Sequence, residues 1–286
     1  MAIVLGPNRY GKAEVRLVHV ARETPAHRLA DLTVGISLSG DLAATHHTGD
    51  NSGVLPTDTM KNTVYAFARE HGVGEPEEFA LRLARHFVTT QAQVHAARVT
   101  VESAGWERLG PHSFRRDGSH TRTCAVTVSA DGAQVVSGLT GLVLLNSTAS
   151  EFLGFPRDRY TTLPETTDRI LATAVDARWR HQGDTADHGA SFAGVRDALI
   201  KGFVHTYSYS LQQTLFAMGS RVLEERPEVA EIRLVLPNRH HYLVDLDPFG
   251  LDNPNEVFLA GDRPYGLIEG TVTRDDAPPA AAKWYL

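Results

Sequence analysis

Five short segments of the sequence carry side chains that could bind a polar ligand or move a proton. They are Tyr10-Gly11-Lys12; Pro56-Thr57-Asp58 with Lys61-Asn62-Thr63; Ser150-Glu151-Phe152, continuing through Tyr160-Thr161-Thr162-Leu163 to Asp168-Arg169; Ser210-Leu211-Gln212; and Leu236-Pro237-Asn238-Arg239-His240. A lysine acts as a base only where burial or nearby cations destabilise its ammonium form. A threonine hydroxyl can relay a proton because it both donates and accepts. A guanidinium group can hold a planar ligand through paired N–H groups.

Each segment also has an ordinary structural interpretation. Thr57 and Asp58 follow a loop punctuated by glycine and proline, so their side-chain oxygens can cap the helix that begins there. A lone lysine is usually solvated, and a lone phenylalanine usually packs in a core. Arg169 beside Asp168 is usually a surface ion pair that contributes little. Taken singly, each structural interpretation outweighs the functional one.

Several common catalytic and binding motifs are missing from the sequence. It contains no Gly-x-Gly-x-x-Gly loop, P-loop, His-Glu-x-x-His or Gly-x-Ser-x-Gly. The pairs His46-His47 and His240-His241 suggest a metal, but adjacent residues on a strand point to opposite faces. Neither pair has a carboxylate or third ligand at a useful spacing. We therefore expect no metal site.

Composition narrows the class of protein. The length of 286 residues suits two domains of moderate size, and 42% hydrophobic with 22% charged residues is typical of a globular chain. The net charge of −6 does not suggest nucleic acid or an anionic membrane as a partner, because both need a basic patch. The single cysteine, Cys124, excludes an internal disulfide and a multi-thiolate metal site. No run of about 18 apolar residues and no signal pattern is present, so we expect a cytoplasmic protein.

Hydrophobic periodicity places the elements that must position these segments. Alternating apolar residues predict strands within 1–20 and at 28–39, 94–102, 113–116, 121–128, 134–146, 168–180, 231–236 with 241–245, and 267–273. Apolar residues three and four apart predict helices over 57–71, from residue 76 onward, and two more within 191–226.

Caps and turns divide these elements. Gly72 is a plausible stop for the first long helix, and Ser210 is a candidate cap for the last. Asp117-Gly118 and Asp131-Gly132 predict tight hairpin turns, because glycine tolerates the positive φ that such turns need.

Each half of the chain then has the order strand–strand–helix–helix–strand–strand. Helices grouped between antiparallel hairpins favour an α+β fold over a doubly wound α/β fold. The boundary falls near residues 136–146, with no linker. We therefore expect the two halves to share a continuous sheet.

The order and spacing of the five segments resemble urate oxidase (uricase), a cofactor-free enzyme of purine breakdown, over about residues 8–273. The resemblance implies two tandem tunnelling-fold (T-fold) domains, here 1–138 and 139–286. In that fold each half contributes a four-stranded antiparallel sheet with two helices on one face. Four subunits would form a tunnel-shaped homotetramer with active sites at subunit interfaces.

The resemblance also implies roles for particular residues. Lys12, Thr57 and His240 would form the catalytic proton relay, with Lys12 and Thr57 supplied by a neighbouring subunit. The implied substrate-binding residues are Thr57, Asp58, Phe152, Leu163, Arg169, Leu211, Gln212, Asn238 and Ile268. The partners would be urate and dioxygen, with no cofactor, no nucleic acid and no membrane. The implied products are 5-hydroxyisourate and hydrogen peroxide.

Three positions depart from the family pattern. Leu153 stands where many relatives carry tryptophan, and Leu211 replaces a commoner valine whose expected contact is through the backbone. His241 stands where an aromatic residue is frequent, and we expect its side chain to be exposed because its neighbour faces the other way.

Two other functions remain open at this point. One is a ligand-binding protein that has lost turnover, and the complete relay argues against it. The other is a pterin-acting relative. Such relatives commonly anchor substrate through a glutamate and often use zinc, and this sequence has neither a glutamate at the clamp nor a metal set.

Overall fold

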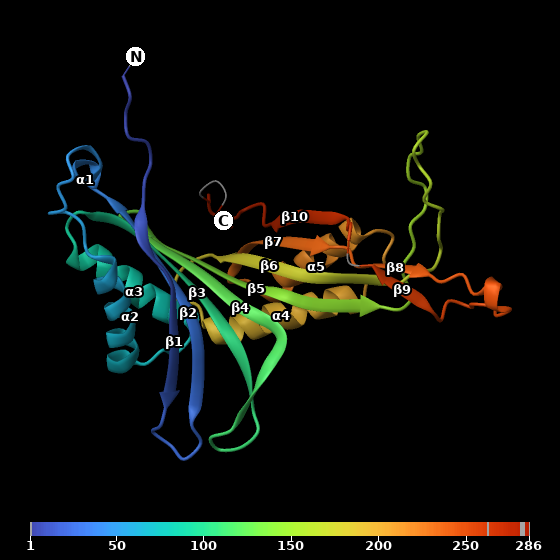
Figure 1. Ribbon diagram of the computed structural model, residues 1–286, viewed down its shortest axis with the longest axis horizontal. Helices are drawn as coiled ribbons and strands as arrows, with labels where there is room; N and C mark the ends of the chain where they lie inside the picture. Colours follow the sequence, from blue (N-terminus) through green and yellow to red (C-terminus); the bar gives the residue numbers. More distant parts are fainter. Residues whose placement is uncertain (1, 262, 281–283, 286) are drawn as a thin grey trace.

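Eight strands form one antiparallel sheet in the order β1-β2-β3-β4-β5-β6-β7-β10 (Figure 1). The computed structural model describes residues 2–261, 263–280 and 284–285. The strands are β1 (Tyr10–Ala21), β2 (Arg28–Gly40), β3 (Val94–Arg108), β4 (Phe114–Ser129), β5 (Gly132–Asn146), β6 (Leu171–His181), β7 (Val229–Pro237) and β10 (Leu267–Thr273). The predicted continuous sheet is confirmed.

Four long helices pack against one face of this sheet (Figure 1). They are α2 (Thr57–His71), α3 (Pro76–Thr90), α4 (His188–Val204) and α5 (Leu211–Glu225). The predicted α+β class and the order of elements in each half are therefore confirmed. Within the described ranges, no helix is both long and apolar enough to cross a membrane.

The helices are held to the sheet by the apolar stripes that the sequence predicts. On α3, Phe79, Leu83 and Phe87 lie four residues apart and are completely buried. Fully burying one such side chain contributes about 1.5–3 kcal/mol, so the stripe anchors α3 firmly. Gly72, with φ of +68°, ends α2 as predicted.

The buried apolar residues fall into two clusters, one for each half. The first ends at Val135 and the second begins at Leu139. Both residues lie on β5, so this strand passes from one cluster to the other. It has a bulge near Gly141, whose φ is +76°. The two clusters support a division near residue 138, and the domains 1–138 and 139–286 stay a prediction.

Of the two predicted hairpin turns, one is present. Ala130 and Asp131 connect β4 to β5, and Gly132 has the positive φ expected of it. Asp117-Gly118 is not a turn but lies inside β4. There it belongs to a bulge, because the pairing jumps from Ala104–Thr121 to Trp106–Arg116. The Asp-Gly pair supplies local curvature in either setting, so its composition alone does not distinguish them.

Hydrophobic periodicity does not predict the short elements of the fold. Helix α1 (Ala43–His47) buries no residue and therefore has no apolar stripe to detect. The strand predicted over 231–236 and 241–245 is interrupted after β7. β8 (His240–Leu243) pairs with β9 (Phe258–Gly261) in a separate two-stranded sheet, and a 3₁₀ turn, η1 (Asp247–Phe249), joins them.

A buried polar cluster connects the two halves behind the sheet. Arg122 on β4 donates to Glu75 and to the completely buried Glu77, both at 2.6 Å. Ser137 on β5 donates to the other oxygen of Glu77 at 2.6 Å and lies 2.9 Å from Nε2 of His181 on β6. Removing one member would leave a buried charge or polar atom without its partner.

This cluster makes stability depend on pH. Burial, reinforced by His188, whose ring centroid lies 5.0 Å away, lowers the pKa of His181 from 6.5 to about 4. The folded chain keeps His181 neutral where the unfolded chain protonates it. Its contribution is therefore complete above pH 6.5 and is lost as the pH falls toward about 4.

We expect the free energy of unfolding of the intact protein to fall in that window by up to roughly 1.4 kcal/mol per pH unit from His181. His181→Gln, which does not titrate, should flatten this dependence in urea unfolding at fixed protein concentration. Parallel pH profiles for the two proteins would contradict the assignment.

Candidate active site

A clasp of short backbone pairings holds the loop over residues 147–170 against the chain that leads into α5. Ser150 forms a bridge with Ser208, whose N–H donates to Ala149 at 3.0 Å. Phe152 and Thr166 exchange hydrogen bonds of 2.9 and 3.2 Å. Residues far apart in sequence are thereby fixed beside one another.

The clasp positions a cation against an aromatic ring. Arg169 donates its backbone N–H to the Ser150 carbonyl at 3.0 Å and its Nε–H to Ser150 Oγ at 3.1 Å. The Cζ of Arg169 lies 5.3 Å from the ring centroid of Phe152, which stacks on Phe155 at 4.9 Å. Burial lowers the pKa of Arg169, but a guanidinium remains charged in proteins. A planar cation next to an aromatic face suits a flat, electron-rich ligand.

The start of α5 lies against the same clasp. Ser210 accepts from the Gln213 N–H at 3.1 Å, so the predicted cap is confirmed. Leu211 is buried and packs in the second core cluster. Gln212, in the first turn, is exposed.

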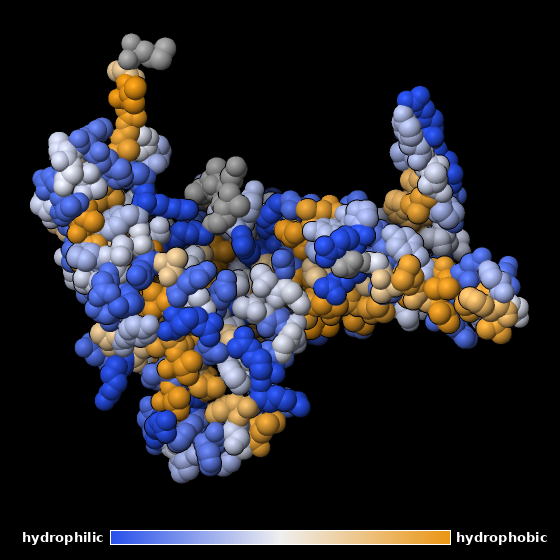
Figure 2. Space-filling model, in the orientation of Figure 1, coloured by the Kyte–Doolittle hydropathy of each residue, from blue (hydrophilic) through white to orange (hydrophobic). Residues whose placement is uncertain are grey.

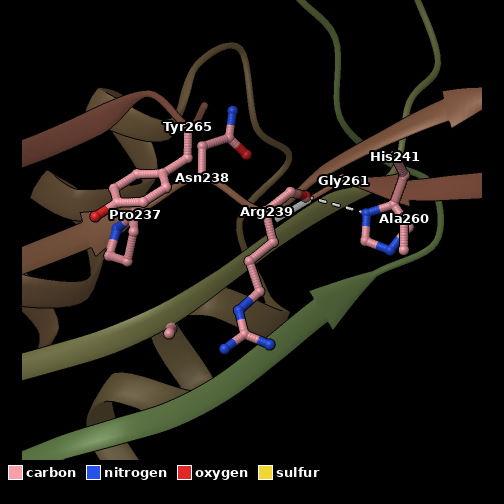
Figure 3. Close-up of a pocket in the computed structure, with 8 residues that line it drawn as sticks. Pro237, Asn238, Arg239, His241, Ala260, Gly261 and Tyr265 are labelled. Atoms are coloured by element: carbon pink, nitrogen blue, oxygen red, sulfur yellow. Dashed lines mark hydrogen bonds between the residues drawn. The ribbon is translucent and has the colours of Figure 1, made fainter. Parts of the chain in front are cut away.

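A cavity of about 380 Å³ lies where β7 ends and the β8–β9 sheet begins (Figure 3). It is lined by Ala174, Pro237, Asn238, Arg239, His241, Ala260, Gly261 and Tyr265. The Asn238 backbone N–H donates to Gly266 at 2.8 Å, which fixes this residue at the wall. Ile268 pairs with Leu236 on β7 and packs against the second core cluster.

His241 differs from expectation, and its neighbour His240 is covered to a similar degree. His241 is half-buried and lines the cavity, with Nδ1 3.0 Å from the Arg239 carbonyl, so the expectation that it is exposed is wrong (Figure 3). His240 is also half-buried and stacks on Tyr242 at 5.8 Å. β8 belongs to a separate two-stranded ribbon, so the alternation expected for the main sheet does not decide which neighbour is covered.

At the other end of the molecule, Lys12 and Thr57 are both half-buried. Lys12 pairs with Ile36 just before a bulge in β1. Thr57 is the first residue of α2, but the N-cap position belongs to Pro56, and no side chain caps the helix. The predicted cap by Thr57 or Asp58 is therefore wrong, because proline displaces it by one position.

The Asp58 carboxylate instead forms hydrogen bonds with neighbouring side chains of α2. It accepts hydrogen bonds from Lys61 and, at 3.1 Å, from Asn62. The hydrogen bond from Lys61 is the main reason that the pKa of Asp58 is lowered, and the charges of Lys61 and Lys12 add to it. Lys12 and Asp58 thus lie within electrostatic reach of each other.

The structure therefore separates the predicted site residues into two groups. Lys12, Thr57 and Asp58 lie on β1 and α2, at the opposite end of the molecule from the loop over 147–170 and β8 (Figure 1). Leu163, on that loop, is 54% exposed. One chain does not bring the two groups together.

The sequence pattern does not single out Tyr265 or assign any role to the hydroxyl of Ser150. Each is a common residue in a loop, with no spacing that signals a site. In the part of the chain that the structure describes, no three His, Cys, Asp or Glu side chains are grouped to hold a metal ion.

The sequence matches the profile of the family described as Uricase over residues 8–127 and 135–269. The chain belongs to the uricase family. Uricase of Arthrobacter globiformis is 53% identical over 275 residues, which cover 96% of this chain and 91% of that one. Uricase of Aspergillus flavus is 36% identical, covering 93% and 95%.

Solved uricase structures share the fold. The crystal structure of the Arthrobacter globiformis uricase superposes with a TM-score of 0.97 at 51% identity, covering all of both chains. Urate oxidase of Bacillus sp. TB-90, at 24% identity and a TM-score of 0.81 over 93% of this chain and 100% of that one, matches in fold.

The uncapped start of α2 leads to a stability prediction. Thr57→Ala should change the free energy of unfolding by less than about 0.5 kcal/mol, because no cap hydrogen bond is lost. Ser210→Ala is the matched control and should cost about 1 kcal/mol, because Ser210 caps α5. Urea unfolding at one protein concentration measures both. A loss for Thr57→Ala equal to that for Ser210→Ala would contradict the assigned geometry.

Proposed function

We propose that this chain is a urate oxidase that converts urate, dioxygen and water to 5-hydroxyisourate and hydrogen peroxide. The observation that carries the proposal is the guanidinium of Arg169 beside the Phe152 ring, held by Ser150, in a chain of the uricase family. A planar cation edge and an aromatic face match the two surfaces of a purine.

The reaction balances without a cofactor. Two electrons leave urate and reduce dioxygen to the peroxide level, and water supplies the hydroxyl that adds to the purine ring. Deprotonated urate is electron-rich enough to give electrons to dioxygen directly. The protein must then supply a proton acceptor, a planar clamp and a place for dioxygen or water above the ring.

The residues of the second half supply the clamp. We assign Arg169 and Gln212 to opposite edges of urate and Phe152 to its face, as hydrogen-bond capacity and aromatic stacking allow. Asn238 in the cavity holds dioxygen or water. The Leu211 backbone, Leu163 and Ile268 complete the binding surface.

The residues of the first half supply the proton relay. We assign the base to Lys12, the relay hydroxyl to Thr57 and the third member to His240, while Asp58 contacts the edge of the substrate. The charge of Lys12 contributes to the lowered pKa of Asp58, so these two side chains belong to the same group. His240 lies on β8 in the other half, so this relay crosses between the two groups.

The separation of the two groups supports a site shared between chains in a homotetramer. Figure 2 shows hydrophobic residues (orange) on the surface at the end that carries β8 and β9, where Leu243, Phe249 and Leu259 are exposed. Exposed apolar patches of this kind mark protein interfaces. The tetramer and the cytoplasmic location stay predictions.

The direct test mixes chelator-treated, purified protein with urate in air. We expect the ultraviolet absorbance of urate to fall while hydrogen peroxide accumulates. Binding of urate without loss of absorbance would overturn the proposal and point to a ligand-binding protein.

The relay and the clamp should respond differently to substitution. Lys12→Met and Thr57→Ala should lower kcat by about 10²–10⁴-fold, because proton transfer is lost, while urate affinity stays within about threefold. Arg169→Ala should weaken urate binding itself, because a charged hydrogen-bonding group is lost. Steady-state kinetics and anaerobic urate binding distinguish the two effects. Near-normal turnover in either relay variant would show that the relay is wrongly assigned.

A further inference from the structure

Ser150 is a completely buried polar residue at the centre of the clasp. Its carbonyl accepts from the Arg169 N–H at 3.0 Å, and its backbone forms the bridge with Ser208. It therefore touches both the segment that carries the arginine and the segment that leads into α5. Backbone hydrogen bonds on both sides hold this residue in place.

The Ser150 hydroxyl also occupies one particular donor of the arginine. Its Oγ lies 3.1 Å from Nε of Arg169. A guanidinium group carries five N–H donors in one rigid plane, so holding Nε restricts the rotation of the whole plane. Among the described residues, nothing accepts a hydrogen bond from Nη1 or Nη2 of Arg169.

Arginine has several rotatable bonds, and a free guanidinium loses much of its freedom when it clamps a ligand. A hydrogen bond that orients the group beforehand lowers that loss and so strengthens binding. The geometry meets this requirement, because the held guanidinium already lies 5.3 Å from the centroid of the Phe152 ring.

We propose that Ser150 is a positioning residue for the urate clamp: its hydroxyl holds Nε of Arg169 so that both Nη groups remain available to the purine edge. The inference rests on the proposed function, because it requires Arg169 to bind urate. Ser150 itself does not contact the substrate and takes no part in proton transfer.

The test compares Ser150→Ala with Ser208→Ala in the full-length protein. Ser208 is equally buried and belongs to the same bridge, but its hydroxyl contacts Thr214 and the Ser210 carbonyl. Urate binding is measured without dioxygen, so that affinity is separated from turnover. We expect Ser150→Ala to raise Kd for urate about tenfold, as loss of a charge-assisted hydrogen bond does, and Ser208→Ala to leave Kd within about twofold. At saturating urate, kcat of Ser150→Ala should fall by less than about threefold.

A double substitution separates positioning from a general structural role. In an Arg169→Ala background, Ser150→Ala should have no further effect on Kd, because the group that it positions is gone. An equal loss in both backgrounds would overturn the inference. A Kd for Ser150→Ala within twofold of that of the unsubstituted protein would also overturn the inference. If Arg169→Ala still binds urate weakly in that case, the proposed function is unaffected. Unchanged binding by Arg169→Ala would instead overturn the role given to that arginine.

Ser150→Cys provides a second variant in case the alanine variant does not fold. A thiol fills a similar space but accepts hydrogen bonds weakly. We expect a Kd above that of the unsubstituted protein and below that of Arg169→Ala. A Kd equal to that of the unsubstituted protein would contradict the inference.

Discussion

The pairing of strand β5 with both β4 and β6 is the interaction on which the rest of the structure depends, because it joins the two halves of the chain. Residues 132–140 of β5 pair with β4 and residues 136–146 pair with β6, so the two core clusters share one continuous sheet. Backbone hydrogen bonds therefore connect the two halves through β5. The half that carries β1 and α2 is therefore held far from the half that carries the clasp (Figure 1). The proposed site needs both groups and would therefore be completed by a second chain.

This separation fits the different demands of binding and chemistry. The proposed clamp for a flat substrate needs precise orientation, and the clasp holds Arg169 over the Phe152 ring through paired backbone segments around Ser150. The residues assigned to the proton relay in the first half, Lys12 and Thr57, lie at the opposite end of the molecule, where Lys12 is within electrostatic reach of Asp58. Assembly would bring the two environments together only in the complete enzyme, where the purine is enclosed.

Much of the fold follows from sequence because periodic burial determines it. The stripe on α3 and the cap at Ser210 are local features, and both are present as expected. α1 could not be predicted because it buries nothing, and the cap at Thr57 was displaced because Pro56 takes that position. The site residues came from a family resemblance, since no single spacing identifies them. The role of Ser150 depends on distant segments meeting, which local patterns do not encode.

The most direct measurement of the central claim is complementation between two inactive variants. Thr57→Ala and Arg169→Ala chains are co-expressed in equal amounts, and all assemblies are purified together. If Thr57 of one chain completes the site that contains Arg169 of another, random mixing in a symmetric oligomer should restore about a quarter of the sites. Urate oxidation at about a quarter of the unsubstituted rate is the predicted result. Activity no higher than that of the separate variants would contradict a site shared between chains.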